Sequence, residues 1–118
     1  MKYNESKLQQ SCVKWFRLQY PNELLFSVPN GGKRNVITAS IMKAEGALSG
    51  VPDIFLAHSS LSNDGWFHGL FIEMKFGNGK MTDNQKIICD KLLAKGYAVK
   101  QCNSFDEFVN IIQNYLKK

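Results

Sequence analysis

Two carboxylates and a lysine have the types and the spacing of a metal-dependent hydrolytic site. Glu73 and Lys75 stand two residues apart in the apolar segment 70–76, and Asp53 follows Pro52 twenty residues earlier. Because the side chains of a β-strand alternate between its faces, Glu73 and Lys75 project on the same side. One face of an otherwise apolar strand would therefore carry a carboxylate next to an ammonium group.

A reversal of the chain between these segments predicts that the two carboxylates meet. The residues Ser62 to Gly65 form a turn signal, and a hairpin about Asn63 and Asp64 places position 53 opposite position 73. Directly opposed strand residues have Cβ atoms roughly 4.5–5.5 Å apart, so both carboxylates could bind one hard cation such as Mg²⁺. The alternative interpretation is an exposed hairpin face with a Glu–Lys pair and a Pro-Asp turn, which requires no chemistry.

Glu5 and Gln85 could complete such a site, although each also has a purely structural explanation. Glu5 precedes Leu8 by three residues and Cys12 by seven, so it shares their helix face and can point toward a sheet. An acidic residue in a first helical turn is also favoured by the helix dipole alone. Gln85 falls in the first turn of the next helix, but Thr82 and Gln85 also have the spacing of a capping box.

Basic and amide side chains suit contacts with the phosphates of a nucleic acid. Asn30, Lys33 and Arg34 lie in a loop that contains glycines, and Lys43 and Lys80 would extend a basic rim. Fifteen Lys and Arg residues against ten Asp and Glu give a net charge of +5, which favours approach to a polyanion. Solvated surface charges would produce the same pattern, so that alternative stays open.

Length and composition predict one domain that spans residues 1–118. A chain of this length with 44% hydrophobic residues can form one core without disulfides or a structural metal. Cys12, Cys89 and Cys102 show no paired spacing, so we expect reduced thiols. The first residues lack the apolar stretch of a signal peptide, and no run of about eighteen apolar residues occurs. These features predict a cytoplasmic protein without a membrane segment.

Periodicity and turn signals predict a mixed α/β chain. The predicted helices cover residues 6–20 (or from 4), 38–45, 82–95 and 104–116, and the predicted strands cover 24–28, 51–57, 70–76 and 97–102. The third and fourth strands, joined by a helix, predict a right-handed βαβ unit with parallel strands. Since the hairpin adds an antiparallel pair, the sheet should be mixed. The last helix should bury Phe108, Val109, Ile112 and Leu116.

Several segments, in their order along the chain, resemble the PD-(D/E)xK nuclease superfamily. The closest resemblance is to its virus-type replication-repair nucleases (VRR-NUC), especially the small stand-alone phage members, and it spans nearly the whole chain. It rests on Glu5–Gln9, Pro29–Arg34, Gly46–Asp53, Leu70–Lys75 and Met81–Gln85. An isolated Glu-x-Lys is unspecific, whereas this ordered set is hard to obtain by chance.

The resemblance implies a fold, an activity and a set of site residues. It implies an α/β restriction-endonuclease-like core with a mixed central sheet flanked by helices, and cleavage of DNA phosphodiesters with Mg²⁺ or Mn²⁺. It also implies that Glu5, Asp53 and Glu73 form an acidic cluster with Lys75 as the catalytic lysine and Gln85 as the helical site residue. Stand-alone members resemble homodimers that act on branched DNA in repair, as Holliday-junction resolvases do, in a bacterial cell or encoded by a phage.

These expectations give one leading hypothesis and two alternatives. Asp53, Glu73 and the main-chain carbonyl of Met74 would hold the metal ion, with Glu5 as a ligand directly or through water, while Lys75 orients the attacking water. The alternatives are a noncatalytic basic module that binds nucleic acid, or a nuclease that prefers flaps or duplex DNA to junctions. A hydrolase of a smaller phosphate ester is weaker still, because the sequence has no glycine-rich phosphate cradle.

Overall fold

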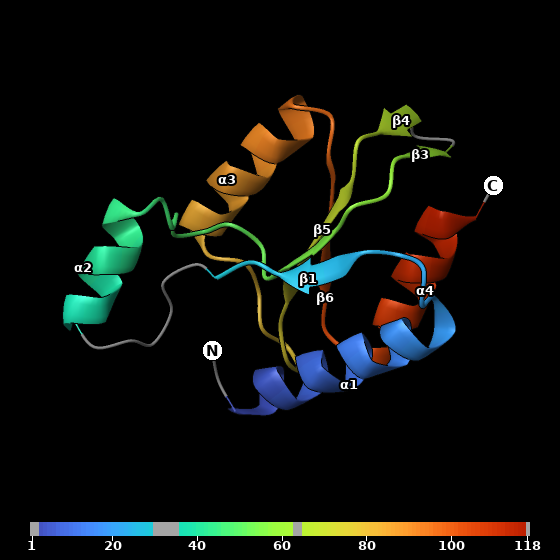
Figure 1. Cartoon of the computed structure of the whole chain (residues 1–118), viewed down its shortest axis with the longest axis horizontal. Helices are drawn as coiled ribbons and strands as arrows, with labels where there is room; N and C mark the ends of the chain where they lie inside the picture. Colours follow the sequence, from blue (N-terminus) through green and yellow to red (C-terminus); the bar gives the residue numbers. More distant parts are fainter. Residues whose placement is uncertain (1–2, 30–35, 63–64, 118) are drawn as a thin grey trace.

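The helices and strands predicted from periodicity are present, in the predicted order. The computed structural model describes residues 3–29, 36–62 and 65–117. Figure 1 shows the arrangement, with α1 and α4 on one side of the sheet and α3 on the other. The helices are α1 (Tyr3–Gln19), α2 (Val36–Ala44), α3 (Asp83–Ala94) and α4 (Phe105–Leu116). The strands are β1 (Leu25–Ser27), β2 (Ile54–Leu56), β3 (Ser60–Ser62), β4 (Gly65–Phe67), β5 (Leu70–Met74) and β6 (Ala98–Cys102).

The central sheet has four strands in the order β1-β2-β5-β6. β1 pairs with β2 and β2 with β5 in antiparallel orientation, whereas β5 and β6 are parallel. The parallel pair follows from the crossover through α3, because two parallel neighbours cannot be joined by a tight turn. The predicted mixed sheet is therefore confirmed.

One face of the sheet forms the hydrophobic core with α1 and α4. Alternate residues of β2 and β5 are fully buried on this face, as the period of two requires. Cys12 and Phe16 of α1 pack against them, together with Phe108 and Ile112 of α4. Val109 and Leu116, which we predicted to be buried, are only half-buried, and Tyr115 is buried in their place. The polar end of Tyr115 tolerates this burial because its hydroxyl donates to the carbonyl of His58 at 2.6 Å.

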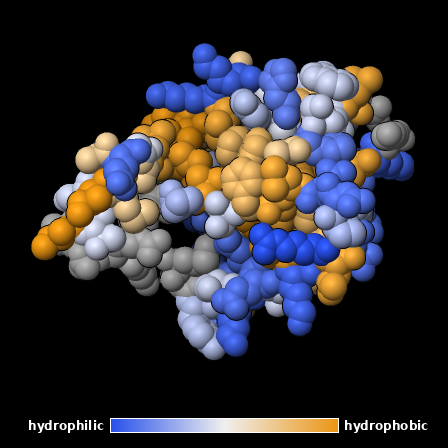
Figure 2. Space-filling view, in the orientation of Figure 1, coloured by the Kyte–Doolittle hydropathy of each residue, from blue (hydrophilic) through white to orange (hydrophobic). Residues whose placement is uncertain are grey.

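The opposite face carries a row of aromatic rings next to the acidic residues. Phe26, Phe55 and Phe71 are cross-strand neighbours, with ring centroids 5.6 Å and 4.5 Å apart, and Tyr97 contacts the last two. Figure 2 shows apolar side chains over the middle of the molecule and hydrophilic ones along the lower edge, where α1 lies. The face that bears Glu73 is therefore largely apolar, which places any charge there in a poorly solvated setting.

The predicted hairpin between β2 and β5 is present, but its strands do not form one continuous ladder. Its tip, β3 and β4, forms a separate two-stranded sheet. The main ladder ends with Leu56 opposite Leu70, and the tip begins with Ser60 opposite Phe67. Three residues (57–59) therefore face two (68–69), and this mismatch interrupts the ladder as a bulge does.

Element boundaries differ from the predictions by a few residues. The second helix begins at Val36 rather than residue 38. β2 begins at Ile54 rather than residue 51, since Pro52 cannot donate a ladder hydrogen bond. The spacing of Ser104 and Glu107 predicts a capping box at the start of α4. Ser104 does cap the helix, but Glu107 accepts a hydrogen bond from the main-chain amide of Asn103 instead of that of Ser104. Within the three described stretches, no helix combines the length and the apolar character needed to cross a bilayer.

Candidate active site

Asp53 and Glu73 lie side by side, as the hairpin argument predicts. Ile54 pairs with Ile72, so the next position along this register places Asp53 opposite Glu73. Both side chains are on the face of the sheet opposite the α1–α4 core, because their strand neighbours Ile54 and Ile72 are fully buried in that core. The hairpin therefore brings together two carboxylates that are twenty residues apart in the sequence.

A backbone hydrogen bond fixes the orientation of Asp53. Its Oδ2 accepts from the main-chain amide of Met74 at 2.8 Å. A strand residue directs its N–H and its C=O toward the same neighbouring strand. The Met74 carbonyl therefore lies on the Asp53 side of β5, where the sequence hypothesis requires it. Burial raises the pKa of Asp53, and the nearby charge of Glu5 adds to this effect, whereas the Met74 amide opposes it.

Glu73 is a buried carboxylate with one oxygen unpartnered. The residue is only 3% exposed, and its Oε1 has no hydrogen-bond partner in the described part of the chain. Burial, followed by the charge of Asp53, raises the pKa of Glu73 to about 7, although Lys75 partly offsets both effects. A buried carboxylate oxygen without a partner is unfavourable, and such groups concentrate at functional sites.

Lys75 and Gln85 hold the second oxygen of Glu73. Lys75 Nζ lies 3.4 Å from Glu73 Oε2, and its side chain is 12% exposed. Gln85 Nε2 donates to the same oxygen at 3.1 Å. The other end of the Gln85 amide closes the predicted capping box, since its Oε1 accepts from the Thr82 amide at 2.9 Å. Gln85 therefore has the structural and the site role at once, which links the start of α3 to the carboxylate pair.

Glu5 is close to this pair but is not grouped with it as a third carboxylate among the described residues. Its charge contributes to the raised pKa values of Asp53 and Glu73, so it lies within electrostatic range of both. Nevertheless, in residues 3–29, 36–62 and 65–117 no three His, Cys, Asp or Glu side chains are grouped to hold an ion. This arrangement favours coordination of the metal by Glu5 through a water molecule over direct coordination.

The site has the chemical character of a Mg²⁺ site. Asp53, Glu73 and the Met74 carbonyl supply oxygen donors, which are the ligands that Mg²⁺ prefers, and this ion usually keeps several waters besides one or two carboxylates. The Oε1 atom of Glu73 is buried without a partner, and a bound cation would give it one. The residues present at the site therefore fit a Mg²⁺ ion.

The structure separates the predicted DNA-binding residues into two sets. Asn30, Lys33 and Arg34 lie outside the described residues. Lys43 is exposed in the last turn of α2, and Lys80 is exposed between β5 and α3. Their contacts with DNA stay a prediction.

The sequence argument missed the residues that position Asp53. Gly50 precedes Val51-Pro52-Asp53 and has φ +96°, a left-handed conformation that favours glycine. A Cβ at this position would lie 2.8 Å from Asn84 Nδ2 and 2.9 Å from an Ile88 side-chain carbon. Asn84 also donates to the Ser49 carbonyl at 3.2 Å. The loop that leads to Asp53 is therefore packed directly on α3.

We expect Gly50→Ala to destabilise the protein and to reduce metal binding at Asp53. The left-handed backbone and the contact with Asn84 should together cost on the order of 1–3 kcal/mol. Gly46→Ala is a matched control, since Gly46 has φ +112° with nothing within 4 Å of an added Cβ. Urea unfolding and Mg²⁺ titration of both variants would measure the effect. Equal losses in the two variants would show that backbone strain alone, and not packing on α3, matters.

Comparisons with known proteins agree with this fold. A family model described as the VRR-NUC domain matches residues 1–106. A solved structure described as a VRR_NUC domain protein superposes with a TM-score of 0.74 at 24% identity, covering 96% of this chain and 88% of that chain. At this identity the likeness shows the shared fold. Among curated proteins no match was found. The match over nearly all of its length shows that the chain belongs to the VRR-NUC domain family, which has a nuclease-type fold.

Proposed function

We propose that this protein is a Mg²⁺-dependent DNA endonuclease that hydrolyses phosphodiester bonds, with Mn²⁺ able to replace Mg²⁺. The observation that carries the proposal is the cross-strand pair of Asp53 and Glu73, with the unpartnered Oε1 of Glu73 beside Lys75. Such a pair is unfavourable in the free protein and becomes favourable once a cation lies between the carboxylates. Family membership independently supports a nuclease.

Asp53, Glu73 and the Met74 carbonyl would hold a Mg²⁺ ion, which would supply charge neutralisation at a nonbridging phosphate oxygen and a more acidic water for attack on phosphorus. The Met74 amide donates to Oδ2 of Asp53 and so fixes the orientation of the carboxylate that would hold the cation. Glu73 is held by Gln85 through Oε2, which leaves Oε1 for the cation. Two hydrogen bonds from neighbouring elements thus preorganise both carboxylates, and preorganisation lowers the reorganisation required during the reaction.

Lys75 would orient the attacking water and stabilise the charge that develops on the phosphate. Its ammonium lies on the same strand face as Glu73, and its side chain is largely shielded from solvent. A positive charge in such a setting interacts with an anionic transition state more strongly than it would in water. A metal-bound water is already acidified, so the reaction does not require Lys75 to act as a base.

We further propose that the substrate is branched DNA, in particular the four-way junction, and that the protein acts as a homodimer. The support is the resemblance to stand-alone VRR-NUC nucleases, together with the net charge of +5. Two-fold symmetry would present two equivalent sites and produce paired, symmetric nicks. The three free cysteines of the described chain suit the reducing cytoplasm, where such a substrate is met.

Cleavage of a synthetic four-way junction tests this function. A flap, a linear duplex and a nucleotide ester should be compared under one condition, with Mg²⁺, with Mn²⁺ and with EDTA, beside Lys75→Ala. We expect paired nicks in the junction that require either metal and disappear with EDTA and in Lys75→Ala, whose fold and DNA binding should persist. Binding without cleavage in any metal would support a noncatalytic module instead. Preference for the flap or the duplex would keep the chemistry and reject the junction.

A further inference from the structure

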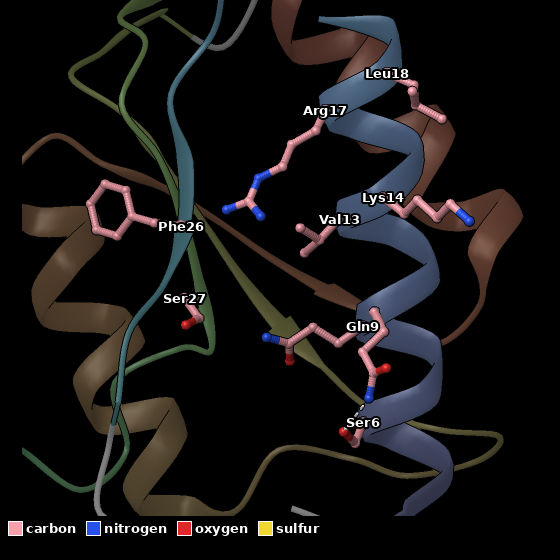
Figure 3. Close-up of a pocket in the computed structure, with 9 residues that line it drawn as sticks. Ser6, Gln9, Val13, Lys14, Arg17, Leu18, Phe26 and Ser27 are labelled. Carbon is pink, nitrogen blue, oxygen red and sulfur yellow. Dashed lines mark hydrogen bonds between the residues drawn. The ribbon is translucent and has the colours of Figure 1, made fainter. Parts of the chain in front are cut away.

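A groove between α1 and β1 is lined by side chains of both elements. It has a volume of about 620 Å³ and opens along β1, which is an edge strand of the sheet. Figure 3 shows Gln9, Val13 and Arg17 directed from α1 toward β1, whereas Lys14 points away from it. The apolar side chain of Val13 therefore lies between the polar side chains of Gln9 and Arg17 along this wall of the groove.

Both walls of this groove lead to the proposed catalytic residues. On α1, the residues Glu5, Gln9, Val13 and Arg17 follow one another at intervals of four and so lie along one side of the helix. On the other wall, the residue after β1, Val28, donates its amide to the carbonyl of Asp53 at 2.8 Å. Arg17 lies roughly 18 Å from Glu5 along the helix axis. A linear ligand in the groove would therefore pass from Arg17 to the acidic site.

The groove has the charge of an anion-binding surface. No carboxylate is among the described residues that line the groove, whereas Arg17 and Lys14 both line it. Arg17 is exposed, and its one hydrogen bond in the described chain is a long one, 3.4 Å, to the carbonyl of Leu25. Its guanidinium has five N–H donors, so most remain available for a phosphate, which this planar group can bind in a bidentate manner.

Gln9 supplies a second, independent sign of a missing ligand. Its Oε1 is buried and has no hydrogen-bond partner. Within the described ranges, the other buried side-chain oxygen in this condition is Oε1 of Glu73, at the proposed metal site. A native protein retains few buried polar atoms without a hydrogen-bond partner, so each of them requires an explanation. The Gln9 oxygen can only accept, so its missing partner must be a donor.

We propose that this groove binds an unpaired stretch of the DNA strand that adjoins the scissile phosphate, with Arg17 on a phosphate and Gln9 on a base. The inference rests on the proposed function and names the strand-binding part of that site. Phosphates and their ester oxygens offer only acceptors, whereas base edges offer amino donors. An unpaired base presents its amino group without competition from a partner base. The groove volume also matches a ligand of small-molecule size and is too small for a duplex.

A binding comparison tests the contribution of Arg17. Fluorescence anisotropy in EDTA, where no cleavage intervenes, would compare a duplex that carries a single-stranded arm with a blunt duplex of equal length. We expect Arg17→Ala to weaken binding of the arm-bearing DNA roughly tenfold, as the loss of a charge-assisted hydrogen bond implies. Lys91→Ala, which removes the same charge from the exposed surface of α3, should have a much smaller effect on both DNAs. Arg17→Lys should retain part of the affinity.

Gln9→Met separates a binding role from a structural one. The side chain keeps its length and loses the unpartnered oxygen, so the free protein should unfold at a higher temperature. Binding of the single-stranded arm should nevertheless weaken severalfold, while the blunt duplex is unaffected. A residue that served only the fold would change stability and arm binding in the same direction. Opposite signs in the two measurements would therefore be characteristic of a ligand contact.

The outcomes of this test are distinct from those of the cleavage assay. Equal losses for Arg17→Ala and Lys91→Ala, or equal losses on the two DNAs, would overturn the groove proposal even if the protein cuts junctions. Absence of metal-dependent cleavage in the native protein would overturn the nuclease proposal, and the anisotropy comparison would still show whether the groove binds a single strand. If the native protein does cleave, Arg17→Ala should raise KM and leave kcat nearly unchanged.

Discussion

Replacing Glu73 with glutamine is expected to reduce Mg²⁺-dependent cleavage by at least about 10³-fold and, at the same time, to stabilise the metal-free protein above neutral pH. The loss of cleavage follows because the substitution removes the charge that would hold the cation next to Lys75. The amide keeps the shape of the side chain and can still accept from Gln85, so the fold should be preserved. Loss of function with gain of stability is typical of a group retained for chemistry.

The expected gain in stability depends on pH, and its sign follows from the raised pKa of Glu73. Its folded-state pKa is about 7, against an ordinary value of 4.5. A carboxyl with a raised pKa contributes full stability below its unfolded value, and that contribution is lost as the pH rises through the folded value. The native protein should therefore lose stability between about pH 4.5 and pH 7 relative to Glu73→Gln, and the two should converge below this window.

Thermal unfolding in EDTA at pH 5 and pH 8 would measure this difference. We expect Glu73→Gln to unfold on the order of 5–10 °C above the native protein at pH 8, since a shift of this size corresponds to a few kcal/mol. Glu45→Gln is a matched control, because Glu45 is exposed. If the glutamine variant were less stable than the native protein at pH 8, the view of Glu73 as an unfavourable buried charge would be wrong.

The second large effect is on metal affinity, which should rise with pH up to about 7. A cation binds the ionised carboxylate, so each pH unit below the Glu73 pKa should weaken Mg²⁺ binding about tenfold. Asp53 also has a raised pKa, which can only steepen this dependence. Binding should therefore be strong at pH 8 and weaker by about a hundredfold near pH 5.

Isothermal titration of the DNA-free protein with Mg²⁺ across this range would test the expectation. The heat of buffer ionisation should reveal a proton released on binding near pH 6 and none at pH 8, because Glu73 is then already ionised. Glu73→Gln should bind weakly at every pH and release no such proton. An affinity that is constant from pH 5 to pH 8 would contradict the assignment of Glu73 as a ligand.

Local patterns in the sequence were enough to predict the positions of the main elements and one side of the site. The alternation along residues 70–76 correctly separated Glu73 and Lys75 from the core positions Ile72 and Met74. The turn signal at residues 62–65 predicted the hairpin, but the turn alone does not set the register of β2 on β5. Pairing of Ser62 with Gly65 would by itself place Asp53 opposite Met74, and the mismatch of residues 57–59 against 68–69 shifts it to Glu73. The Thr82–Gln85 spacing predicted the cap of α3, which is formed as expected.

Long-range packing decided the features that the sequence patterns left open. No periodicity indicates that Glu73 is 3% exposed with an orphaned oxygen, because burial depends on how α3 covers the sheet. The hydrogen bond from Met74 to Asp53 and the contact of Gly50 with Asn84 join segments far apart in the chain. The interval of four residues from Glu5 through Gln9 to Arg17 was visible, but only the neighbouring β1 shows that this stripe lines a groove.

The sequence by itself determined which residues are the candidates for the chemistry, in which order, and on which face of each strand and helix they lie. These properties follow from spacing, since the periods of 2 and 3.6 residues are properties of the backbone. Only the tertiary structure decided how strongly those residues act on one another. Desolvation, the raised pKa of Glu73, the indirect position of Glu5 and the groove beside α1 all depend on distances between elements that no local pattern encodes.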